Sequence, residues 1–97
     1  MRHFHRTSVG PDDVMQLADA FFGALGLATT ATAARTRGFA GPLGTMQLSV
    51  RMEGGHYTFV EAHTDQVGES RLDKNVKKFF VQLHRRVDTG HAMGAGY

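Results

Sequence analysis

Residues 46–63 read MQLSVRMEGGHYTFVEAH, and this stretch decides the fold because two strand-like segments flank a Gly-Gly pair. From Met46 to Met52 every second side chain is apolar, which is typical of a strand with one buried face. Gly54 and Gly55 are typical of a two-residue β-hairpin turn. The stretch therefore predicts an antiparallel hairpin with one face in the core.

The turn also predicts which side chains of the second strand face the core. A two-residue turn pairs Met52 with Tyr57, so the buried face takes alternate residues of the second strand: Tyr57, Phe59, Glu61 and His63. A register shifted by one residue would bury the other set, which is Thr58, Val60 and Ala62. We favour the first register because it buries both aromatic side chains.

Two further segments show the apolar spacing of amphipathic helices. One runs from Val14 to Leu25, with Pro11 in the expected first turn and Gly26 as the expected C-terminal stop. The other predicts a longer helix over residues 70–87. Each helix has one apolar stripe, so each needs a surface to cover.

The remaining segments predict two more strands. Residues 2–9 alternate weakly before Gly-Pro and predict an edge strand, and the threonine-rich residues 28–37 predict another. Residues 38–44 contain three glycines and a proline, which indicates a loop and argues against a central strand.

These elements predict an α+β fold, a two-layer sandwich of order β-α-β-β-β-α, with an antiparallel sheet covered on one face by two amphipathic helices. The order is similar to that of small helix-grip ligand-binding proteins and of the repeat unit of TATA-box-binding proteins. That resemblance concerns element order, and it implies a fold and not a function. We expect one domain over residues 1–88 and a flexible tail over residues 89–97.

The preferred register also predicts a pocket between the sheet and the helices. A tight loop at 40–43 would place Arg35 opposite Leu48, beside Glu61 and near His63. The predicted ligand-binding residues are Arg35, Tyr57, Phe59, Glu61 and His63. Such a pocket would suit a small molecule, or catalysis by a general base with an arginine-held anion. The other interpretation is a cross-strand ion pair that is open to solvent.

The second helix carries most of the positive charge. Between Ser70 and Val87 six basic side chains stand against Asp73 alone, a net charge of +5 in a chain whose net charge is +2. The predicted anion-binding residues are Lys74, Lys77, Lys78 and Arg85. The segment matches no nucleic-acid-binding motif, so a solvated helix face and a membrane-surface contact are the other interpretations.

The sequence gives little indication of disulfides, metal sites, cofactor binding or catalysis. The chain has no cysteine, which excludes disulfides and thiolate metal sites. His3, His5 and His63 could supply three metal ligands, but no supporting motif accompanies them, so we interpret them as surface histidines. Phosphate-binding loops, dinucleotide-binding motifs and nucleophile motifs are absent from the sequence. We expect no metal and no cofactor, and catalysis is the less favoured interpretation.

The sequence thus predicts a small cytoplasmic binding module without a transmembrane segment. A homodimer is expected because a domain of 97 residues buries a thin core. The expected partners are a second copy and a nucleic acid or other polyanion. The alternative is a small molecule in the predicted pocket.

Overall fold

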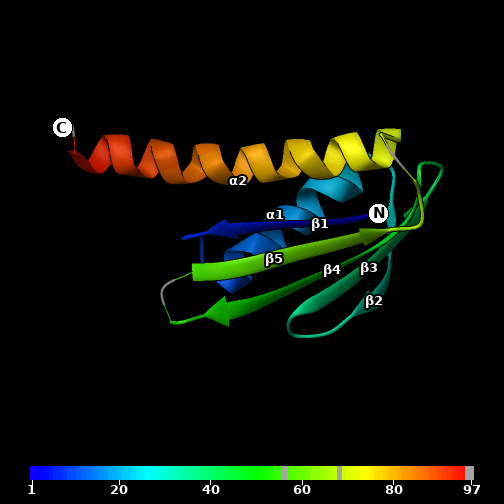
Figure 1. The fold of residues 1–97 in the computed structure, drawn as a ribbon, viewed down its shortest axis with the longest axis horizontal. Helices are drawn as coiled ribbons and strands as arrows, with labels where there is room; N and C mark the ends of the chain where they lie inside the picture. The colour runs from blue at the N-terminus through cyan, green and yellow to red at the C-terminus, as the bar shows by residue number, and fades with distance from the viewer. Residues whose placement is uncertain (56, 68, 96–97) are drawn as a thin grey trace.

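The computed structural model describes residues 1–55, 57–67 and 69–95, with the side chains of the last helix described as far as Arg86. In this part the chain forms β1 (Arg2–Thr7), α1 (Pro11–Ala24), β2 (Ala28–Thr32), β3 (Thr36–Gly41), β4 (Gly44–Glu53), β5 (Tyr57–Thr64) and α2 (Arg71–Ala95). The strands make one antiparallel sheet in the order β1-β5-β4-β3-β2. Both helices lie on the same side of it (Figure 1), which confirms the predicted α+β class.

The segment between α1 and β4 contains two strands where one strand and a loop were predicted. β2 pairs with β3, and Gly38 lies opposite Gln47 in the middle of the sheet. The prediction that glycine excludes a central strand here is wrong, and crowding gives the reason. A Cβ atom on Gly38 would come within 2.7 Å of Thr30 Oγ1. The missing side chain therefore lets β2 and β3 approach each other.

The register of the β4–β5 hairpin is the alternative one, so the preferred prediction was wrong. Glu53 pairs with Tyr57 and Val50 pairs with Val60, which makes the connection one residue longer than a Gly-Gly turn. The buried face of β5 consequently carries four small or β-branched residues: Thr58, Val60, Ala62 and Thr64. Phe59 still escapes solvent, with 6% of its surface exposed, because other side chains cover it on the opposite face.

Helix α1 begins and ends where the sequence predicts. Pro11 occupies its first turn, and Gly26 adopts a φ of 88° just beyond its C-terminus. The N–H of Leu27 donates to the carbonyl of Phe22 at 3.1 Å, and the N–H of Gly26 donates to the carbonyl of Gly23 at 3.0 Å. This is a Schellman motif, which only a residue comfortable at positive φ can close without strain.

Helix α2 begins at a side-chain cap on Ser70. The Ser70 hydroxyl accepts the backbone N–H of Asp73 at 3.0 Å and donates to its carboxylate at 2.6 Å. The helix continues to Ala95, and its C-terminal end extends beyond the sheet (Figure 1). Since side chains after Arg86 lie outside the described set, the flexible tail at 89–97 stays a prediction.

The core lies between the sheet and the two helices. Helix α1 covers β2, β3 and β4, while α2 covers β1 and β5. The largest fully buried apolar side chains of this core are Phe22, Phe39, Phe79, Leu48, Leu72, Leu83, Val14, Val60 and Val76. Among the described residues, the helices are not long and apolar enough to cross a membrane.

Candidate functional site

The five residues predicted to line a pocket do not meet between the sheet and the helices. Tyr57, Phe59, Glu61 and His63 lie on the sheet face that the helices leave uncovered, as a consequence of the register. Arg35 is exposed in the β2–β3 turn. Its carbonyl accepts the N–H of Val50, so Arg35 does not lie opposite Leu48 as predicted. The predicted pocket geometry is therefore wrong, while ligand binding by these residues individually stays a prediction.

The neighbouring residue Arg37 lies opposite Leu48 and has structural partners. Its Nε donates to Asp19 Oδ1 of α1 at 3.1 Å, and one terminal nitrogen donates to the carbonyls of Ala33 and Thr36. These contacts tie the β2–β3 turn to α1. Arg37 thus serves the fold through its Nε and one of its terminal nitrogens.

The uncovered face of the sheet carries an aromatic cluster, which we define as Phe4, Tyr57 and Phe59. The rings of Phe4 and Phe59 stack with centroids 5.8 Å apart. The guanidinium groups of Arg51 and Arg6 lie 4.4 Å and 5.1 Å from the Phe59 ring centroid. Phe4 and Tyr57 remain 57% and 54% exposed, so the cluster presents apolar surface to a partner.

Ion pairs balance the charges around the aromatic cluster. Arg2 pairs with Glu61, and Arg6 pairs with Glu53 at 2.6 Å. Hydrogen bonds from Arg2 and Arg6 are the main cause that lowers the pKa of Glu61 and of Glu53, respectively. Both carboxylates are therefore ionised at neutral pH, and this face carries both signs of charge.

A hollow of about 510 Å³ lies beside the aromatic cluster, over β2, β3 and β4. Its lining includes the small residues Ala31, Gly38 and Ala40. It also includes polar residues, among them Thr45, Gln47, His63 and Asp65. The uncovered face therefore carries both exposed aromatic side chains and a hollow.

On the opposite side of the molecule, α2 presents a basic face, which we define as Arg71, Lys74, Lys77, Lys78 and Arg85. All five side chains are exposed, as is Val81 between them at 48%. In the described part of the chain, Lys77 has a carboxylate partner, Glu69 at 3.6 Å, and the other four have none within 4.0 Å. The structure thus brings together all four predicted anion-binding residues on one outer surface.

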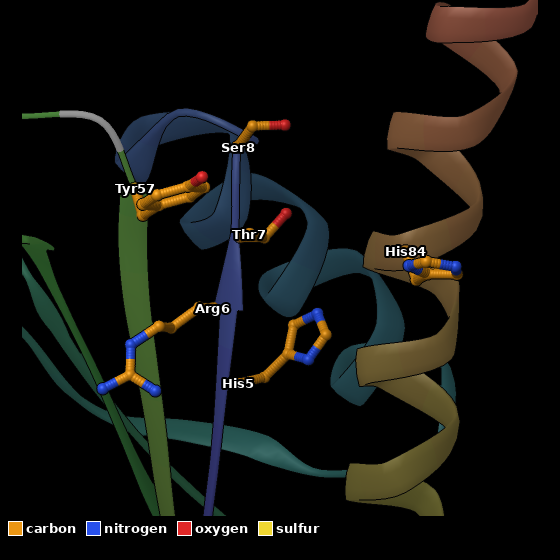
Figure 2. Close-up of a pocket in the computed structure, with 6 residues that line it drawn as sticks. All are labelled: His5, Arg6, Thr7, Ser8, Tyr57 and His84. Atoms are coloured by element: carbon orange, nitrogen blue, oxygen red, sulfur yellow. The ribbon is translucent and has the colours of Figure 1, made fainter.

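A smaller cavity of about 240 Å³ lies between β1 and α2. Its lining residues are His5, Arg6, Thr7, Ser8, Tyr57 and His84. Figure 2 shows His5, Thr7 and Ser8 directed toward α2, whereas the guanidinium of Arg6 points away from it. The His5 ring also stacks on Phe80 of α2, with centroids 5.2 Å apart.

Burial and the positive charge of nearby His84 lower the pKa of His5. Burial is the larger cause because the ring is partly withdrawn from water between β1 and Phe80. His5 is consequently neutral at pH 7, with one nitrogen able to donate and one able to accept.

The structure corrects the prediction that His3 and His5 lie at the surface. Both are partly buried against α2, because β1 turns its odd-numbered side chains toward the helices. His63 lies on the other face of the sheet, so these three residues do not form one metal site. Among the residues described, no group of three or more histidine and acidic side chains could hold a metal ion. His56 and His91 have no described side chain.

Sequence reasoning missed the cavity between β1 and α2, although one signal was available. The alternation of His3 and His5 in an edge strand puts both imidazoles on one face. Which face that is, and that His84 lies across from it, depends on how α2 packs.

No protein-family model matches the chain, and no curated protein matches it.

Proposed function

We propose that this protein is a small binding module that contacts the phosphate backbone of a nucleic acid through the basic face of α2. The single observation that carries the proposal is the set of four exposed cations without a carboxylate partner in the described chain, which are Arg71, Lys74, Lys78 and Arg85. Cations that are not paired within the protein keep their full attraction for an external anion.

The spacing of these cations supports a backbone contact. They recur at helical intervals of three, four and seven residues, so they form one stripe that is about 21 Å long. Several consecutive phosphates of a duplex fit within that length. The stripe has no aromatic side chain on its exposed surface, which favours backbone contact over base stacking.

The test is the salt dependence of binding to a short duplex DNA, measured by fluorescence anisotropy. With four phosphate contacts, the slope of log K against log salt is expected near −3.6, since each contact contributes about −0.9. Lys78→Gln should reduce the slope by about 1, and Lys74→Gln combined with Lys78→Gln by about 2.

The matched control is Arg35→Gln, which removes one exposed charge from the β2–β3 turn, away from α2. It should leave the slope unchanged. Equal effects of Arg35→Gln and Lys78→Gln would show attraction by net charge alone and would contradict a contact through α2. Binding to anionic vesicles with no binding to DNA would assign the basic face to a membrane surface instead.

A second candidate function is self-association through the uncovered sheet face. The supporting observation is that this face carries both an exposed aromatic cluster and a hollow around Gly38, together with both signs of charge. In the proposed dimer, a two-fold axis brings the aromatic cluster of each copy onto the hollow of the other. The basic faces of both copies then remain outside the dimer.

Sedimentation velocity over a range of protein concentrations tests this dimer. Phe4→Glu should give a monomer, because it places a charge in the aromatic cluster. The matched control is Val81→Glu, which changes an exposed apolar residue of similar accessibility on α2. A monomer from Val81→Glu and a dimer from Phe4→Glu would place the interface on α2 and overturn the assignment.

A further inference from the structure

We propose that the cavity between β1 and α2 binds a small organic anion, whose carboxylate or phosphate group is held by the imidazole and hydroxyl groups of His5, His84, Thr7 and Ser8. This site is separate from the basic face of α2, and it shares Arg6 and Tyr57 with the edge of the uncovered sheet face. Four observations carry the inference.

The first is that, among the described residues, the cavity is lined by donors and by no acid. The six lining residues that the structure describes include no aspartate or glutamate. The Thr7 oxygen accepts the N–H of Val9 at 3.2 Å, which leaves its proton free of any acceptor in the described chain. The Ser8 hydroxyl is exposed and makes no hydrogen bond among the described residues. A bound oxyanion would accept from both hydroxyl groups.

The second observation is that these donors come from opposite walls. Figure 2 shows His5, Thr7 and Ser8 on the β1 side and His84 on the α2 side of the same space. The stacking of His5 on Phe80, with an interplanar angle of 15°, holds its ring in place. A ligand in the cavity would therefore meet groups that are already positioned.

The third observation concerns electrostatics around His5. In the part of the chain that the structure describes, the titratable and charged groups that line the cavity with His5 are His84 on α2, Tyr57 on β5 and Arg6 on β1. Of these, Arg6 directs its guanidinium elsewhere, to Glu53 at 2.6 Å. The positive charge of His84 disfavours protonation of His5. An anion between the two imidazoles offsets that repulsion, so binding should be accompanied by proton uptake.

The fourth observation is that the cavity suits an anion better than a metal ion. Structural metal sites take about four ligands, and catalytic ones about three from the protein. Here two imidazoles face the cavity, and the described residues offer no third histidine or acidic ligand. The ring of Tyr57, half exposed at the same cavity, adds an apolar wall. The favoured ligand class is thus a small anion that carries a flat apolar group.

The experiment follows the histidine Cε1–Hε1 signals by NMR while benzoate, phenyl phosphate or inorganic phosphate is added. The signals of His5 and His84 should shift and saturate, and those of His63 should not. Benzamide, the neutral analogue of benzoate, should not bind. Benzoate affinity should rise several-fold between pH 7.5 and pH 6.0, since benzoate itself stays ionised over that range. Stronger binding of phenyl phosphate than of inorganic phosphate would identify the apolar wall.

Variants assign the effect to the cavity. His84→Gln is expected to weaken benzoate binding about tenfold or more, and the fold should tolerate this change because His84 is exposed. The matched control is His63→Gln, an exposed histidine on the other face of the sheet, which should bind benzoate normally. Lys74→Gln combined with Lys78→Gln should also leave benzoate binding unchanged.

Three results would overturn the inference. These are equal binding of benzamide and benzoate, unchanged benzoate affinity in His84→Gln, and saturable binding of Zn²⁺ without binding of any anion. None of them bears on the duplex-binding test of the basic face.

Discussion

His3 and Asp73 connect the first strand to the last helix across 70 residues of sequence, with His3 Nε2 2.7 Å from Asp73 Oδ1. The same carboxylate accepts hydrogen bonds from Thr64 at 2.8 Å and Ser70 at 2.6 Å, and Asp73 is fully buried. Three donors around one buried carboxylate satisfy it, and they join β1, β5 and the start of α2 at one point.

Asp73→Asn should therefore lower the free energy of unfolding by about 2–4 kcal/mol, because the amide cannot accept from all three donors. Urea unfolding followed by circular dichroism measures the change. Asp12→Asn, an exposed acid in the first turn of α1, is the control and should change it by no more than about 1 kcal/mol. Similar small effects in both variants would contradict the structural role of Asp73.

The contribution of Asp73 should also depend on pH in a defined direction. Burial favours the neutral acid, but hydrogen bonds from Ser70, His3 and Thr64 outweigh it and lower the pKa of Asp73. Because the folded-state pKa lies below the unfolded-state value, the stabilisation is complete above about pH 4 and is lost as the pH falls through the folded-state pKa. The difference in unfolding free energy between wild type and Asp73→Asn should shrink accordingly. A difference that grows in acid would contradict this assignment.

A second pH dependence is expected from His5. Its cause is the burial of a base, whereas the cause at Asp73 is the hydrogen bonding of an acid. The lowered pKa of His5 means that the unfolded chain takes up a proton first as the pH falls. Wild type should therefore lose stability below about pH 6.5 relative to His5→Gln, until His5 is also protonated in the folded state. Thermal unfolding of both proteins at a series of pH values measures this. Parallel curves would show that His5 is not desolvated.

The hairpin register predicts which substitutions in β5 matter. Val60→Ala should cost about 2 kcal/mol, because Val60 is fully buried beneath the helices. Glu61→Leu should change the unfolding free energy far less, since Glu61 makes an ion pair on the uncovered face. Denaturant unfolding compares the two variants. A large loss from Glu61→Leu with little change from Val60→Ala would favour the register in which Glu61 points to the helices.

Local patterns were sufficient to predict α1, the start of α2 and the fold class, whereas α2 continues to Ala95, beyond the predicted end at residue 87. The apolar spacing from Val14 to Leu25, with Pro11 before it and Gly26 after it, describes α1 closely. The basic face of α2 was equally visible, because helical geometry alone decides which residues share a face. These features depend on interactions between residues that are close in sequence.

The register of β5 needed information that the hairpin sequence does not contain. Both registers bury a plausible set of side chains, and the choice depends on what covers Phe59. On the uncovered face it is shielded by Arg6, Arg51 and Phe4, so the chain loses little by placing it there. The space beneath the helices can then be filled by the smaller residues of β5, which lets α2 pack closely.

The sequence by itself determined the composition of each helix face, the place of the turn between β4 and β5 and the charge of α2, because period and turn chemistry act over a few residues. Only the tertiary structure decided the strand register, the central position of Gly38 and the meeting of His5 with His84. Each of these depends on contacts between segments that are far apart in the chain. Such contacts decide which side chains are covered on each of the two faces of the sheet.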